Sequence, residues 1–143
     1  MGARGCWLGF AVLGAWAAGG GRAHAEDRAV EPVRQWAGLL DDKKLTDLAP
    51  AKGYVTSEAG WRKVWEAWRP GDELPAVDFS KHLVLVGLGG MYPVGHDLRV
   101  TDGGDLTVRL SPRVPGKPGF GYGLAVVERA GLKTIRGKAI EPD

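Results

Sequence analysis

The feature that most constrains the fold of this chain is a stripe of tryptophans in residues 57–69. Apolar side chains recur there at the spacing i, i+3, i+4 and i+7, which places them on one face of an α-helix. These side chains are Trp61, Val64, Trp65 and Trp68. A buried large aromatic side chain covers roughly 150–250 Å². A broad apolar surface elsewhere in the chain must therefore pack on this face.

The segments after the predicted helix can supply that surface, because they have the period of two that is typical of β-strands. Residues 82–88 form an almost unbroken apolar run, which is typical of a central strand covered on both faces. Residues 97–101 and 106–110 alternate on either side of an Asp-Gly-Gly-Asp turn and predict a hairpin. We therefore expect an α+β fold, with one main amphipathic helix packed on an antiparallel β-sheet in a single small domain.

Residues 120–129 predict a strand with one large face and one small face. The large face consists of Phe120, Tyr122, Leu124 and Val126, and the small face of Gly121, Gly123 and Ala125. A face made of glycine lets a neighbouring element approach closely. We expect the tryptophan stripe to pack over this small face.

The first 25 residues have the layout of a secretory signal peptide. A positive start at Arg4 precedes an apolar run over residues 7–18, and the segment ends in the cleavage pattern Ala-His-Ala. The run is too short to span a bilayer, although an uncleaved anchor is the alternative interpretation. We expect residues 1–25 to be removed, residues 26–52 to form a loose lead and a first strand, and residues 53–143 to form the α+β domain. The protein is then periplasmic or extracellular, with no integral membrane segment after cleavage.

The charge and cysteine content of the expected mature chain limit its partners. Removal of residues 1–25 leaves 17 basic and 17 acidic residues, and a neutral domain with interspersed signs lacks the electrostatic footprint of a nucleic-acid-binding protein. The one cysteine, Cys6, lies in the signal segment. The mature domain is therefore expected to have no disulfide and no thiol nucleophile.

Three segments in this order resemble the C-terminal domain family of the protease-complex subunit, the PrcB-type domain. They are the Ser-x-x-x-Trp helix of residues 57–68 with its Trp-x-x-x-Trp, the Val-Asp-Phe-Ser-Lys of residues 77–81 that runs into the apolar strand, and the Pro-Gly-Phe-Gly-Tyr-Gly-Leu-Ala-Val-Val-Glu-Arg of residues 118–129. The resemblance spans about residues 54–140. It implies a PrcB-like α+β domain at residues 53–143 and an exported, non-enzymatic accessory or interaction role. The expected structural core consists of Trp61, Val64, Trp65, Trp68 and Phe79.

No catalytic residue is predicted. The histidines of the mature chain are His82 and His96, and Asp78, Ser80 and Asp97 lie near them in the sequence. A Ser-His-Asp set can be written from these residues, but no serine of the mature chain stands in a Gly-x-Ser-x-Gly elbow. We expect Asp78 instead to accept a hydrogen bond from the backbone of Ser80 in a turn.

The sequence also predicts neither a metal nor a cofactor. His82, His96 and Asp97 lack the usual spacing of metal ligands. The Asp-Gly-Gly-Asp of residues 102–105 has too few ligands for a calcium loop. The glycines of residues 87–90 are not followed by the Lys-Ser/Thr of a phosphate-binding loop.

Two glycine-rich loops, residues 89–96 and 112–120, are the best candidate for a functional surface, although they can equally be plain connections. Tyrosine and methionine are enriched at interfaces. The expected contact residues are Met91, Tyr92, His96 and Tyr122. We predict an exported binding or accessory module with a protein partner in the cell envelope, for example a protease complex. The alternative is a small exported hydrolase or a carbohydrate-binding protein whose tryptophans stack on sugars.

Overall fold

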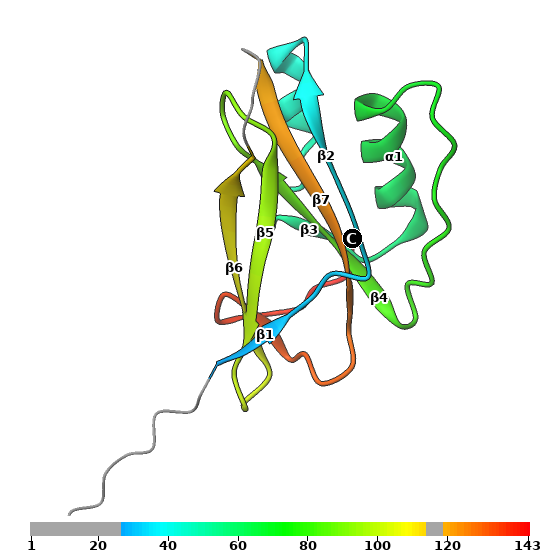
Figure 1. Ribbon diagram of the computed structural model, residues 1–143. Coiled ribbons are helices and arrows are strands. Elements are labelled where there is room, and N and C mark those ends of the chain that lie inside the picture. Colours follow the sequence, from blue (N-terminus) through cyan, green and yellow to red (C-terminus); the bar gives the residue numbers. More distant parts are fainter. Residues whose placement is uncertain (1–26, 114–118) are drawn as a thin grey trace, which may run out of the picture.

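The computed structural model describes residues 27–113 and 119–143, so the expected signal peptide, residues 1–25, lies outside the described residues. The described chain forms two β-sheets and one α-helix, arranged as three layers (Figure 1). The first sheet has the strand order β2 (Arg34–Leu40), β7 (Phe120–Glu128), β4 (His82–Leu88) and β3 (Tyr54–Val55). The second sheet has the order β1 (Arg28–Val30), β5 (Val94–Val100), β6 (Asp105–Pro112), β8 (Thr134–Ile135) and β9 (Lys138–Ala139).

The expectation of an α+β fold with one main helix on one sheet is wrong. The regular structure of the described residues is mostly strand, divided between two sheets, and its one α-helix, α1 (Glu58–Trp68), has 11 residues. Alternation in a sequence indicates that a segment is a strand, but it does not indicate which sheet the strand joins. The hairpin of β5 and β6 is present, but it belongs to the second sheet.

Helix α1 begins and ends where local chemistry requires. The Ser57 side chain accepts a hydrogen bond from the backbone N–H of Gly60 at 3.1 Å and so caps the first turn. Glu58 lies in that turn, where a negative charge suits the helix dipole. Pro70 follows the C-cap residue Arg69 and disfavours a further helical turn there.

The stripe of α1 packs on the first sheet and forms one of two cores. Its members Trp61, Val64, Trp65 and Trp68 are at most 5% exposed. Side chains from one face of β4 and β7 complete this core: Val84, Val86, Tyr122, Leu124 and Val126. Phe79 is partly buried against the same cluster. Three tryptophan rings also form a cluster, because Trp36 of β2 lies 5.7 Å from Trp61 and 5.2 Å from Trp65 between ring centroids.

The indole N–H groups of α1 fasten the surrounding loops. Trp61 and Trp65 donate to the carbonyl groups of Pro75 and Asp72 at 3.0 and 3.2 Å. Trp68 donates to the carbonyl of Leu45 at 2.7 Å, in the 3-10 helix η1 (Lys43–Leu48). Buried indole groups require such acceptors, so the stripe fixes the loops on both sides of the helix as well as the sheet.

The second core lies between the two sheets. It contains the opposite face of β4 and β7 together with β5, β6 and β8: Leu83, Leu85, Ala125, Val127, Leu98, Val100, Leu106 and Ile135. Strand β4 is therefore covered on both faces, as its unbroken apolar run predicts. Strand β1 pairs with β5 at Arg28–Val30, so part of the segment expected to be a loose lead joins the second sheet.

The tryptophan stripe packs on the large face of β7, and not on the glycine face as expected. Trp68 lies against Tyr122, with ring centroids 5.1 Å apart. The glycine face is covered by residues 92–94, at the start of β5, because a Cβ atom on Gly121 or Gly123 would collide with the carbonyl oxygens of Tyr92 or Val94. Large side chains fill the distance between a helix and a sheet, whereas glycine suits an approach of backbone to backbone.

Candidate interaction surface

The connection between β4 and β5 presents apolar side chains to solvent. Met91 is 59% exposed and Tyr92 is 38% exposed. Leu88, at the end of β4, is 39% exposed. We refer to residues 89–93 as the Met91–Tyr92 turn. Large exposed apolar side chains are a common feature of interaction sites when they occur together.

Backbone hydrogen bonds hold the Met91–Tyr92 turn on neighbouring strands. The N–H of Gly89 donates to the carbonyl of Gly121 at 2.8 Å, and the N–H of Gly121 donates to the carbonyl of Gly90 at 2.6 Å. At the other end of the turn, the N–H of Arg113 donates to the carbonyl of Pro93 at 2.8 Å. The turn is thus fixed to β7 and to the residue after β6, although its side chains are exposed.

The glycine face of β7 allows the backbone of the turn to lie directly against the backbone of β7. The carbonyl group of Tyr92 occupies the space that a side chain on Gly121 would need. The position of the turn therefore depends on the glycines of β7. These glycines determine where the exposed side chains of the turn lie. A surface that is already ordered loses less conformational entropy when it binds a partner.

Two of the four expected contact residues do not belong to this surface. Tyr122 is 3% exposed and lies on the opposite face of β7, where its hydroxyl accepts a hydrogen bond from Arg69 Nη1 at 3.3 Å. His96 lies on β5, where the residue is partly exposed but its Nε2 atom is buried. Of the expected contact residues, the structure brings only Met91 and Tyr92 together at the exposed turn. Period-two alternation already puts Tyr122 on the large face, and that face turns out to lie beneath α1.

The sequence reasoning missed the exposed apolar residues at the ends of strands. Leu88 ends the apolar run of β4, and Leu110 of β6 is 36% exposed. Both residues continue an apolar pattern whose earlier members are buried or, at Val108, partly buried, so periodicity alone gives no signal that they are exposed. The signal that remains is position, because side chains at the ends of strands extend beyond the covering layer.

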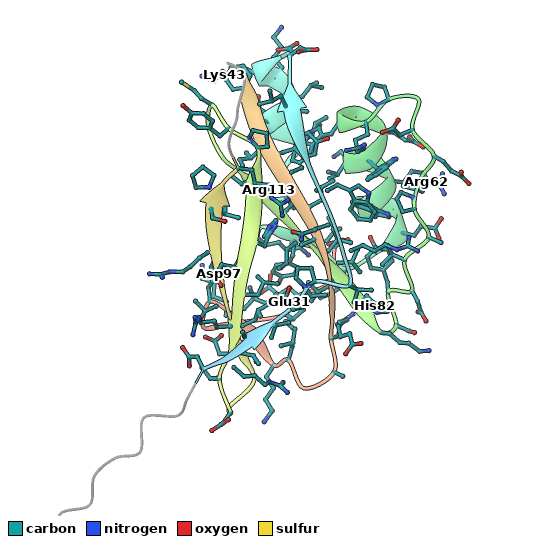
Figure 2. All side chains as sticks on the ribbon, in the orientation of Figure 1. Glu31, Lys43, Arg62, His82, Asp97 and Arg113 are labelled. Carbon is teal, nitrogen blue, oxygen red and sulfur yellow. The ribbon has the colours of Figure 1, made fainter. Side chains whose placement is uncertain are left out.

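Of the residues of the possible Ser-His-Asp set, Asp78, Ser80 and His82 lie near one another, but in the wrong order for catalysis, whereas His96 and Asp97 lie on β5 of the second sheet. Asp78 Oδ1 accepts hydrogen bonds from the backbone N–H of Ser80 at 3.0 Å and from its hydroxyl, which confirms the predicted turn. These bonds lower the pKa of Asp78. His82 lies at the start of β4 (Figure 2). Its Nδ1 atom is 3.2 Å from the main-chain carbonyl of Asp78. A triad needs the imidazole between the hydroxyl and the carboxylate, whereas here the serine bonds the carboxylate directly.

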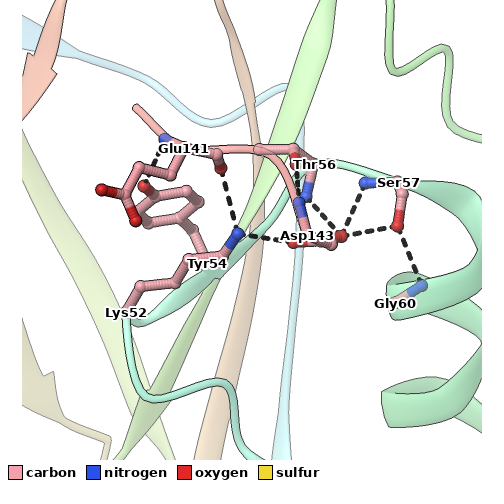
Figure 3. A network of polar contacts seen from close by, with 7 residues as sticks. All are labelled: Lys52, Tyr54, Thr56, Ser57, Gly60, Glu141 and Asp143. Atoms are coloured by element: carbon pink, nitrogen blue, oxygen red, sulfur yellow. Dashed lines mark hydrogen bonds and ion pairs between the residues drawn. The ribbon is translucent and has the colours of Figure 1, made fainter. Parts of the chain in front are cut away.

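A polar network at the start of α1 is a structural contact (Figure 3). Asp143 Oδ2 accepts hydrogen bonds from the backbone N–H groups of Thr56 and Ser57 at 3.0 and 2.9 Å and from the Ser57 hydroxyl at 2.6 Å. Its Oδ1 atom lies 2.8 Å from Lys52 Nζ. Burial raises the pKa of Asp143, but the bonds from Lys52, Ser57 and Thr56 together outweigh burial, so the pKa is lowered. This carboxylate occupies the anion-binding position that a helix N-terminus provides.

Residues 27–113 and 119–143 contain no group of three His, Cys, Asp or Glu side chains placed to hold a metal ion. No helix among them is long and apolar enough to cross a membrane. Comparison of the chain with protein-family models, with curated proteins and with solved structures finds no match. The resemblance to the PrcB-type domain therefore stays a prediction from the sequence.

Proposed function

We propose that this protein is an exported accessory module that binds a protein of the cell envelope through the Met91–Tyr92 turn. The observation that supports this proposal most directly is an exposed methionine and tyrosine on a turn that β7 holds by its backbone. The signal-peptide layout of residues 1–25 supports export. The resemblance to the PrcB-type domain supports an accessory role beside a protease or a comparable envelope protein.

The chemistry of the turn indicates the kind of partner surface that it fits. Methionine adapts to irregular apolar surfaces, and tyrosine adds a large apolar ring with a polar end. Residues of this kind contribute most when a partner's pocket covers them completely. The proposed partner therefore has an apolar pocket that receives one or both side chains.

Affinity capture with matched variants tests the proposal. The protein, exported and purified from its host, is used to capture proteins from the envelope fraction, and Met91→Ala and Tyr92→Ala are used in parallel. Val33→Ala is the control, because Val33 is 54% exposed but precedes β2 and lies outside the turn. We expect one protein to be retained by wild type and by Val33→Ala and to be lost from the turn variants. Retention by all four proteins, or by none, would contradict the proposal.

One observation favours the alternative of a hydrolase. Ser80 and His82 line a shallow surface hollow together with Glu128, which is the register partner of His82 on β7. A catalytic use of this hollow requires the Ser80 hydroxyl to leave Asp78 and to bond the His82 ring. Hydrolysis of simple activated esters that is abolished in both Ser80→Ala and His82→Gln would support this alternative. Activity that is absent from the wild type would leave the accessory role as the better proposal.

A further inference from the structure

His96 stands between the two sheets at the end that carries the Met91–Tyr92 turn. It shares a face of β5 with Leu98 and Val100, which belong to the core between the sheets. Its Nε2 atom lies 3.2 Å from the position that a Cβ atom on Gly87 of β4 would occupy. The imidazole therefore packs against the backbone of β4, which only a glycine leaves open at that point.

The Nε2 atom of His96 has no hydrogen-bond partner. It is the one buried side-chain nitrogen or oxygen in this condition among the residues that the structure describes. Buried polar atoms are nearly always paired, so an exception needs an explanation. A neutral imidazole can leave one nitrogen as a bare acceptor at moderate cost, but a protonated imidazole must donate from both nitrogens. The buried position has no acceptor for the second N–H.

The charged groups around His96 also disfavour protonation of its ring. Arg113, which follows β6, and Arg136, in the turn between β8 and β9, both act on the ring with positive charge. Arg113 is held in place by a hydrogen bond to Gln35 of β2 at 2.7 Å. Asp97 is adjacent in sequence, but it lies on the other, exposed face of β5 opposite Arg109. From the first sheet, the backbone of β4 lies against the ring at Gly87.

We propose that His96 is an acid-sensitive contact between the two sheets, which closes this end of the molecule when it is neutral and opens it when it takes up a proton. The segment that would move first is the start of β5. Val94 packs against Gly89 and Gly123 from the same face of β5 as His96. Displacement of His96 therefore loosens the strand that follows the Met91–Tyr92 turn.

The direction of the pKa agrees with this geometry. Burial, followed by the charges of Arg113 and Arg136, lowers the pKa of His96 from 6.5 to about 4. At a pH between these two values, His96 is therefore protonated in an opened or unfolded chain but neutral in the closed form. The closed form is fully favoured above pH 6.5 and loses this advantage as the pH falls to about 4. Between pH 7.5 and pH 5 the opening equilibrium should shift by roughly 30-fold.

Hydrogen exchange on the full chain tests the proposal. Protection of residues 89–96, corrected for the intrinsic effect of pH, is compared between pH 7.5 and pH 5 in wild type, His96→Leu and His82→Leu. We expect a large loss of protection in wild type and in His82→Leu, and a much smaller loss in His96→Leu. An equal loss in all three proteins would overturn the proposal.

A second measurement covers the case in which His96→Leu does not fold. The ring resonances of the wild type are followed by NMR between pH 8 and pH 3, and His24→Gln and His82→Gln identify the other two of the three histidines, which leaves the signal of His96. A ring that titrates near pH 4, together with broadening of residues 89–96 over the same range, supports the proposal. A ring that titrates near its ordinary value of 6.5 overturns it.

Discussion

The carbonyl group of Tyr92 lies directly over the Cα atom of Gly121, in space that any larger residue would fill. This contact joins two segments that are 29 positions apart in the sequence. It also connects an exposed turn to the central strands of the first sheet, because β7 pairs with both β2 and β4. The shape of the candidate surface thus depends on a residue that no partner can touch.

Substitution of Gly121 by alanine should displace the turn. The added methyl group collides with the backbone of Tyr92, which cannot rotate away as a side chain would. Overpacking of this kind costs about 1–3 kcal/mol, and urea denaturation at pH 7.5 measures the loss. Gly103→Ala is the control, since the nearest atom to its Cβ position is Thr101 Oγ1 at 3.7 Å. If both variants unfold at the same urea concentration as the wild type, the backbone of Tyr92 can move away from β7 at little cost, and this prediction is wrong.

Substitution of Tyr122 should affect stability and leave partner binding unchanged. Tyr122→Ala removes a ring that is buried against Trp68, and a large-to-small change of this type costs about 3–5 kcal/mol. Tyr122→Phe keeps the ring and loses only a 3.3 Å hydrogen bond from Arg69, so its cost is about 0.5–1.5 kcal/mol. Denaturation measures both values. Loss of the captured partner from the well-folded Tyr122→Phe would show that Tyr122 contributes to the surface after all.

Local patterns in the sequence are sufficient to predict the elements whose structure depends on the periodicity of a single segment. The spacing of Trp61, Val64, Trp65 and Trp68 predicts α1. The continuous apolar run predicts a strand covered on both faces, and β4 is such a strand. Each of these predictions needs only the periodicity of one segment and the preferences of its neighbours.

The division into two sheets could not be predicted in this way. Whether β5 and β6 extend the first sheet or cover it depends on contacts between segments far apart in sequence, and a period of two is the same in both cases. The same limit explains why the tryptophan stripe was expected on the wrong face of β7. The small face of β7 indicates a close neighbour, but the sequence does not say whether that neighbour is a helix or the backbone of Tyr92 and Val94.

The contact of Asp143 with the start of α1 should stabilise the fold in a pH-dependent way. Asp143→Ala leaves the Ser57 cap in place but removes the acceptor for the N–H groups of Thr56 and Ser57, and loss of such a hydrogen bond costs about 1 kcal/mol. Because the pKa of Asp143 is lowered in the folded chain, its contribution is complete above the ordinary value of 3.8. The contribution disappears as the pH falls through the lower folded value.

Urea denaturation of wild type and Asp143→Ala at several pH values measures this contribution. The difference between the two proteins should be constant from pH 7 to about pH 5 and should shrink at lower pH. Asp47→Ala is the matched control, because Asp47 is exposed at the edge of the same region and accepts no side-chain hydrogen bond among the described residues. A difference that persists unchanged at pH 2.5 would mean that packing, and not the charged carboxylate, carries the effect.

Substitution of Arg136 should show how much its charge contributes to the lowered pKa of His96. Arg136 is the one residue other than glycine with positive φ in the described chain, at 52°, and asparagine tolerates this conformation better. Arg136→Asn therefore removes a positive charge without new backbone strain. Burial is the larger cause of the shift, so the pKa of His96 should rise above about 4 but stay below 6.5. NMR titration of the ring measures the change, and Lys138→Asn, at a neighbouring exposed position, is the control. A pKa of His96 that returns fully to 6.5 in Arg136→Asn would mean that charge, and not enclosure between the sheets, keeps the imidazole neutral.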